Sequence, residues 1–232
     1  MKTNDYQKQN VKVFDEMYKK NWGNDWPSET MISYYYNIVR SHIFSGGGYR
    51  PKVLEFACGT GANLLFFHSI GFEVYGIDSS ESAIDRCVNR SGFSKENFSA
   101  KNILSECRIC DIFPGIKFDL IICLSALSYF NNEDIFLLNK QFSEVLREEG
   151  IIYTNMYTTL REWPLEKSDN GLYIAMDSGS VNEVTYLNLI EDKNEIQMLY
   201  DSMFETIAIK RTIMEGLRGD NESVHYIGRK LT

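Results

Sequence analysis

Long hydrophobic runs are absent from this sequence, and no apolar stretch is long enough to cross a bilayer. The opening residues, MKTNDYQKQN, also lack the apolar core of a signal peptide. An odd number of cysteines, five, without an export signal favours free thiols over a disulfide framework. We therefore expect a cytoplasmic protein that does not enter membranes.

Positive charge is also scarce. The chain has 24 Lys and Arg against 32 Asp and Glu, which gives a formal net charge of −8. That balance disfavours tight, non-specific binding to nucleic-acid phosphates, because such binding depends on cationic side chains. The total leaves room for a local basic patch, but we do not expect nucleic acid as the partner.

The chain has 232 residues, 44% of them hydrophobic, which is enough for one domain with one substantial core. Residues 1–45 carry apolar side chains at helical spacing, and SGGGYRPK then breaks the pattern. Strand and helix patterns alternate after that point. The strand patterns cover 52–57, 72–78, 105–112, 118–125 and 150–158, and the helical patterns cover 61–70, 80–90 and 132–149.

Alternation at these lengths indicates βαβ units and a parallel sheet covered on both faces. Residues 158–190 are polar and turn-rich, 195–203 have a helical pattern, and 204–214 with 224–231 suggest a closing antiparallel pair. We therefore predict an α/β fold: a doubly wound, mostly parallel seven-stranded sheet with an antiparallel closing hairpin, preceded by N-terminal helices.

The stretch VLEFACGTGANLLFF changes from a strand to a helix at Gly59 and Gly61. Glycines at such a junction let the backbone turn sharply and let a ligand approach without meeting a Cβ atom. A dinucleotide site usually has a third glycine three residues after the second, where this chain has Leu64. The two glycines alone are also compatible with a tight turn that binds nothing.

Three acids come at the ends of successive expected strands. Glu55 lies in the first strand, Asp78 ends the second, and Asp111 ends the third. Ligands of doubly wound sheets bind at the carboxyl ends of the strands, where an acid can accept hydrogen bonds from both hydroxyls of a ribose. Together with the glycines, these acids predict a ligand with several donor groups and a positive charge.

At these residues the sequence resembles the class I S-adenosylmethionine-dependent methyltransferases. The resemblance runs from about Trp22 to Glu148 and rests on EFACGTG, VYGIDSS, LSALSYF and FSEVLREEGIIYT. It implies one methyltransferase domain over residues 1–232, with a helical lid (1–45), a cofactor-binding half (50–157), and an acceptor-side insertion with closing strands (158–232).

The resemblance also implies the cofactor, S-adenosylmethionine, and the residues that would bind it. These are Glu55, Ala57, Cys58, Gly59, Thr60, Gly61, Asp78 and Ser79, with Asp111 and Ile112 beside adenine and Leu124 and Ser125 near the methionine part. Ala57 stands where a glycine is more usual, and we expect this exchange to be tolerated if its φ is negative. Glu148 and Glu149 replace a usual Pro-Gly turn, which does not affect the cofactor site.

Signatures of nucleic-acid amino-methyltransferases are missing: LSALSY stands where Asn-Pro-Pro-Tyr or Asp-Pro-Pro-Tyr is common, and there is no proline-cysteine nucleophile. The aromatic N-terminus is similar to the lid of small-molecule methyltransferases. We therefore predict a small-molecule acceptor. Tyr129 is the expected catalytic residue, the expected acceptor-binding residues are Trp26, Tyr129, Tyr157 and Trp163, and no metal is expected.

Several alternatives stay open from the sequence. The run Tyr34 to Tyr36 fits core packing as well as a lid, and Tyr129 fits packing as well as chemistry. Cys107 and Cys110 have metal-ligand spacing without a second pair, which favours buried thiols. His225 falls in the expected last strand and is not expected at the site. A protein or RNA methyltransferase and a non-catalytic cofactor-binding regulator are the competing functions.

Overall fold

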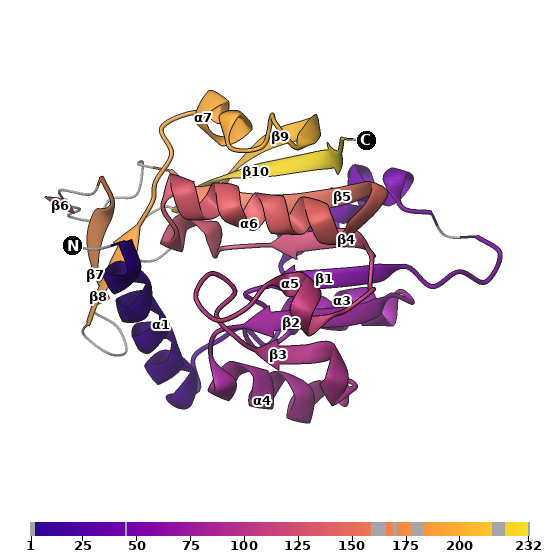
Figure 1. Ribbon diagram of the computed structural model, residues 1–232, viewed down its shortest axis with the longest axis horizontal. Coiled ribbons are helices and arrows are strands. Elements are labelled where there is room, and N and C mark those ends of the chain that lie inside the picture. The colour runs from indigo at the N-terminus through magenta and orange to yellow at the C-terminus, as the bar shows by residue number, and fades with distance from the viewer. Residues whose placement is uncertain are drawn as a thin grey trace.

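The computed structural model describes residues 3–44, 46–158, 166–168, 171–177, 183–214 and 221–231. Its centre is a seven-stranded sheet in the order β3-β2-β1-β4-β5-β10-β9 (Figure 1). The five strands from β3 to β5 are parallel, and β10 is antiparallel to both β5 and β9. The predicted fold class is therefore confirmed, including the closing hairpin. The strands are β1 (Lys52–Phe56), β2 (Glu73–Asp78), β3 (Phe98–Ala100), β4 (Phe118–Cys123), β5 (Leu146–Tyr157), β9 (Phe204–Met214) and β10 (Asn221–Lys230).

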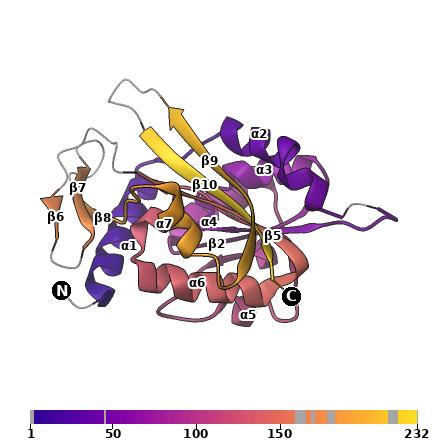
Figure 2. The same ribbon diagram turned by 90° about the horizontal axis from the view of Figure 1, so that it is seen from above.

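Helices cover both faces of this sheet because neighbouring residues of its buried strands point to opposite sides. Leu54 belongs to one core cluster, with side chains of α5, α6 and α7, while Val53 belongs to the other, with side chains of α2, α3 and α4. Figure 2 shows α2 and α3 on one side and α5 and α6 on the other. The helices are α2 (Glu29–Asn37), α3 (Ala62–Ser69), α4 (Glu81–Ser91), α5 (Ile109–Ile112), α6 (Asn132–Val145) and α7 (Lys193–Met198), with 3-10 turns η1 (Val39–His42), η2 (Lys95–Asn97) and η3 (Leu127–Tyr129).

The third strand was predicted in the wrong place. Residues 105–112 do not form a strand; β3 consists of Phe98–Ala100, and Ala100 pairs with Asp78. The later segment instead forms the short helix α5, where Ile109 is buried and the Asp111 carboxylate accepts a hydrogen bond from the Arg108 N–H at 3.0 Å. This helical cap and the packing of Ile109 outweigh the strand-like alternation of the sequence.

Two other boundaries differ from the prediction. The helix expected over 132–149 ends at Val145, and β5 begins at Leu146. Glu149 has a φ of 61°, the left-handed conformation that glycine adopts readily in such a turn. Between 158 and 190, where only turns were expected, a second antiparallel sheet contains β6 (Glu166–Lys167), β7 (Tyr173–Asp177) and β8 (Glu183–Leu187).

Helix α1 (Thr3–Lys19) joins this small sheet to the main one. The Asn10 side chain donates to the carbonyl oxygens of Tyr129 and Tyr186 at 3.3 and 3.0 Å, and it accepts from the Tyr186 N–H at 2.9 Å. Figure 1 shows α1 lying beside the end of the main sheet, next to β7 and β8. No helix in the described part of the chain is long and apolar enough to span a membrane.

Helix α2, in contrast, packs on a face of the sheet. Its Tyr35 is 5% exposed and makes edge-to-face contacts with Phe66, Phe67 and Phe72. Tyr36 beside it is 47% exposed. For Tyr35, core packing is therefore the correct alternative.

This arrangement predicts different effects for two neighbouring tyrosines. Tyr35→Ala should lower the free energy of unfolding by about 3–5 kcal/mol, because it leaves a cavity among three phenylalanine rings. Tyr36→Ala, the matched control, should cost less than about 1 kcal/mol. Urea unfolding of both variants measures the difference, and equal losses would contradict the assignment of Tyr35 to the core.

Candidate functional site

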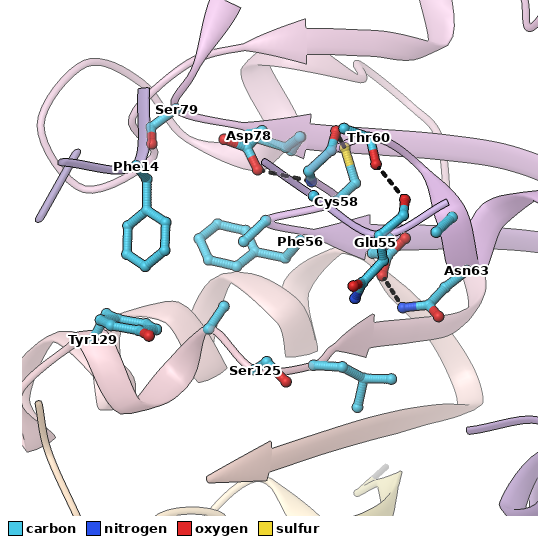
Figure 3. Close-up of a pocket in the computed structure, with 18 of the residues that line it drawn as sticks. Phe14, Glu55, Phe56, Cys58, Thr60, Asn63, Asp78, Ser79, Ser125 and Tyr129 are labelled. Atoms are coloured by element: carbon cyan, nitrogen blue, oxygen red, sulfur yellow. Dashed lines mark hydrogen bonds between the residues drawn. The ribbon is translucent and has the colours of Figure 1, made fainter. Parts of the chain in front are cut away.

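A pocket of about 670 Å³ lies at the carboxyl ends of the parallel strands. Residues from the ends of β1, β2 and β4, from the loop after β3, and from α1 line it. Figure 3 shows Glu55, Asp78, Ser125 and Tyr129 around this space. The site therefore occupies the edge of the sheet where the strand order reverses between β1 and β4, as doubly wound folds require.

The loop after β1 can accommodate only glycine at two places. Gly59 has a φ of 52°, and a Cβ atom there would lie 2.6 Å from the Tyr18 hydroxyl. Gly61 has a φ of 75°, and its Cβ would lie 2.3 Å from Cys87 Sγ. Larger residues would therefore clash with α1 on one side and with α4 on the other.

Ala57 adopts a φ of 57°, so the condition of a negative φ is not met. A residue with a Cβ atom in this left-handed region costs about 1–2 kcal/mol. Ser125, at the end of β4, has a φ of 59°. Both strained residues line the pocket, in keeping with the tendency of backbone strain to concentrate at functional sites.

Glu55 is a buried acid, 3% exposed, with only one of its oxygens paired. Asn63 Nδ2 donates to Oε1 at 2.7 Å, whereas Oε2 has no hydrogen-bond partner among the described residues. Burial raises the pKa of Glu55 to about 8; the charge of Asp78 adds to this rise, and the hydrogen bond from Asn63 opposes it. An unpaired buried carboxylate oxygen is costly, and a cationic donor in the pocket would satisfy it.

Asp78 is also buried, but both of its oxygens are held. The N–H groups of Gly59 and Ser80 donate to Oδ2 and Oδ1, each at 2.9 Å. Desolvation raises the pKa of Asp78, and these backbone donors partly oppose the rise. Each carboxylate oxygen can accept a further hydrogen bond, so Asp78 and its neighbour Ser79 present acceptors to the pocket.

Asp111 and Ile112 do not line the pocket, because they lie in α5 and not at the end of β3. The residues that follow β3 take their place: Lys101, Asn102, Ile103 and Leu104 line the pocket. The Lys101 N–H donates to the Asp78 carbonyl at 2.8 Å, which sets this loop beside the end of β2. Asp111 and Ile112 were expected at the site because the sequence pattern placed the third strand at residues 105–112.

At the end of β4, Leu124, Ser125 and Tyr129 line the pocket. The Tyr129 ring meets Phe14 of α1 edge-on, with centroids 4.7 Å apart and an interplanar angle of 81°. Trp26 also lines the pocket and is 83% exposed.

Tyr157, the third aromatic candidate, is not among the described residues that line this pocket. Tyr157 packs against the small apolar cluster of Ala175, Leu187 and Leu189. Trp163 lies outside the described residues.

Several pocket residues were missed from the sequence. His225 of β10 and Thr212 of β9 reach the pocket through the closing hairpin, and Asn155 reaches it from β5. Only the strand register brings these residues to one place, so no local motif indicates them. Phe14 and Tyr18 were part of an expected helical pattern, but the sequence did not indicate which face of that helix would meet the pocket.

In the part of the chain that the structure describes, no group of three His, Cys, Asp or Glu side chains could hold a metal ion. Cys107 and Cys110 are half-buried and pack against one of the core clusters, and neither lines the pocket. 

Comparison with known proteins adds to this geometry. Residues 53–150 match the family model of the methyltransferase domain. An mRNA cap guanine-N(7) methyltransferase of Caenorhabditis elegans is 27% identical over 183 residues, which cover 72% of this chain and 46% of that protein. The chain spans less than half the length of the curated relatives it matches.

Solved structures with the same fold cover nearly the whole chain. The 1,6-didemethyltoxoflavin-N1-methyltransferase of Burkholderia thailandensis, with bound 1,6-didemethyltoxoflavin and S-adenosylhomocysteine, has a TM-score of 0.70 at 15% identity and covers 100% of this chain and 92% of that one. The magnesium protoporphyrin IX methyltransferase of Synechocystis PCC 6803, with bound S-adenosylhomocysteine, has a TM-score of 0.61 at 15% identity and covers 97% of each chain. These likenesses establish the fold.

One conclusion follows from the geometry and the comparisons together. It rests on the glycine loop, the buried acids at the ends of β1 and β2, the match over residues 53–150 and the shared fold. The chain has the fold of the class I methyltransferases, and its residues 53–150 match the family model of the methyltransferase domain.

Proposed function

We propose that this protein transfers a methyl group from S-adenosylmethionine to a small-molecule acceptor. The observation that carries the proposal is Glu55, which lines a pocket of about 670 Å³ and whose buried Oε2 has no partner among the described residues. A pocket of that volume is in the range of small-molecule sites. The oxygen is placed to accept a hydrogen bond from the cofactor's ammonium group.

The residues at the sheet edge fit the rest of the cofactor. Asp78 would accept from the ribose hydroxyls, and the loop from Ala57 through Cys58 and Thr60 to Gly61 would approach the methionine part closely. The loop after β3, not Asp111 and Ile112, would flank adenine. When bound, the cofactor supplies an electrophilic methyl group on its sulfonium. The chain's own residues bind and orient both reactants and exclude water.

We propose that α1 and residues 20–28 form the lid. Thr60 Oγ1 donates to the Asn24 carbonyl at 2.8 Å, Arg86 donates to the Trp22 carbonyl at 2.6 Å, and the Ser28 N–H donates to Asn63 Oδ1 at 3.0 Å. These contacts tie the segment to the glycine loop and to α3 and α4. Such a cover favours an acceptor small enough to be enclosed.

Tyr129 is the residue we propose to contact the acceptor, since it lines the pocket beyond the cofactor half and packs against Phe14 of the lid. Leu124 and Ser125, which follow β4, also line the pocket. Trp26 would cover the entrance.

Glu55 should make cofactor binding depend on pH. With a pKa of about 8 it is mostly protonated at neutral pH, and a bound ammonium favours the carboxylate, so binding releases a proton. The affinity for S-adenosylhomocysteine should therefore rise as pH rises, by up to about tenfold per unit, and level off above the pKa. Calorimetry in buffers of different ionisation enthalpy measures the proton release.

Glu55→Gln should bind more weakly and lose this pH dependence. Glu133→Gln, which removes an exposed carboxyl outside the pocket, should behave like the wild type. Wild-type binding without proton release would contradict the proposed role of Glu55.

The acceptor class can be tested with methyl-labelled cofactor. Incubation with a metabolite extract and, separately, with total RNA should label the small-molecule fraction and change little with salt. Each phosphate contact of a single-stranded RNA acceptor would instead add about −0.7 to the slope of log affinity against log salt. Asp78→Ala should weaken cofactor affinity by about 1.5–3 kcal/mol and serves as the low-activity control.

Labelled RNA with steep salt inhibition would replace the small-molecule proposal by an RNA methyltransferase. Cofactor binding without any labelled product would favour a non-catalytic regulator.

A further inference from the structure

The pocket extends well beyond the half that fits the cofactor. The acids and loops of β1, β2 and β3 line one half, while the strand order continues through β4, β5, β10 and β9 on the other side. Ser125, Asn155, His225 and Thr212 line that second half, one from each of these four strands or the loop that follows it. This half is available to the acceptor if the proposed function is correct.

Asn155 has a fixed orientation in this second half. The Ser125 N–H donates to Asn155 Oδ1 at 2.6 Å, which identifies the oxygen of the amide and turns Nδ2 the other way. The side chain is 5% exposed, and Nδ2 makes no hydrogen bond to any described residue. Because Asn155 lines the pocket, its unpaired Nδ2 is a donor available to a ligand there.

The His225 ring lies beside Asn155 and is held in place by three neighbouring side chains. Tyr153 Oη lies 3.0 Å from Nδ1, Ser223 Oγ lies 3.0 Å from Nε2, and the Tyr34 ring meets the imidazole edge-on at 5.1 Å. Burial lowers the pKa of His225 to about 4, so the ring carries no charge at neutral pH. The histidine is therefore an uncharged surface whose two nitrogens are already engaged.

Charge in the pocket further restricts the acceptor. The one cationic side chain among the described lining residues is Lys101, which lies after β3 in the cofactor half. No other described side chain that lines the pocket supplies a positive charge to its second half, where His225 is neutral. A carboxylate or phosphate would find no countercharge there, whereas flat aromatic surfaces are provided by Trp26 and Tyr129.

We propose that Asn155 and His225 form the acceptor subsite, in which Asn155 Nδ2 donates a hydrogen bond to a carbonyl oxygen or ring nitrogen of an uncharged heterocycle. The bond from Ser125 holds Asn155 in place, and the His225 ring packs against the bound heterocycle. This assignment rests on the proposed function and makes Asn155 a specificity-determining residue.

Three bicyclic probes of similar size test the subsite with the protein saturated with S-adenosylhomocysteine. Quinazolin-4-one is an uncharged heterocycle with a carbonyl, naphthalene has no acceptor atom, and 2-naphthoate carries a negative charge. Quinazolin-4-one should bind at least about tenfold more tightly than the other two, because only it can accept from Asn155 and needs no countercharge. Ligand-observed NMR measures the affinities, with magnetisation transfer from the His225 ring protons as the readout of location.

Asn155→Asp keeps the oxygen that accepts from Ser125 and replaces the donating amide nitrogen. At a pH where this aspartate is ionised, quinazolin-4-one should bind about tenfold more weakly, while naphthalene and S-adenosylhomocysteine keep their affinities. Asn188→Asp, a change at an asparagine outside the pocket, is the matched control.

Failure of quinazolin-4-one to bind, tighter binding of 2-naphthoate, or equal loss of all probes in Asn155→Asp would each overturn the subsite. If Asn155→Asp does not fold, the ranking of the probes on the wild type and the transfer from His225 still decide the question. Cofactor binding and label transfer are measured separately, so a wrong subsite is distinguishable from a wrong function.

Discussion

The site depends on the burial of the Glu55 carboxyl group at the end of β1. Burial deprives this acid of water, and the described chain supplies a partner for only one of its two oxygens. The result is a carboxyl group that is mostly protonated at neutral pH until a cation arrives. A ligand with an ammonium group can relieve this unfavourable burial, and we propose that the cofactor's ammonium group does so.

The same carboxyl group is linked to the proposed lid. Asn63 donates to Glu55 through Nδ2 and accepts from the Ser28 N–H through Oδ1, so one amide joins the acid to the segment that precedes α2. Thr60 makes a parallel connection to the Asn24 carbonyl. These short links join β1 and α3 to the segment that we propose as the lid.

The part of the pocket at the ends of β1 and β2 was largely predictable from the sequence because its determinants are local. A strand, two glycines, a helix and an acid at the end of the next strand all lie between Glu55 and Asp78, and the fold brings them together directly. The third strand was misplaced because three residues, Phe98–Ala100, give no periodic signal, whereas the alternation in CRICDI suits a strand on pattern alone. The proposed acceptor subsite was not predictable, because Asn155 and His225 are paired across the β5–β10 register, which depends on pairing between distant segments.

A crystal structure of the protein with S-adenosylhomocysteine tests the central claim most directly. The account predicts that the amino group of the ligand lies within hydrogen-bond distance, about 2.7–3.2 Å, of Glu55 Oε2, and that the ribose hydroxyls lie within reach of Asp78. A complex in which the ligand occupies the pocket while Oε2 still has no partner would contradict the account, because the buried carboxyl group would then have no role in recognising the cofactor.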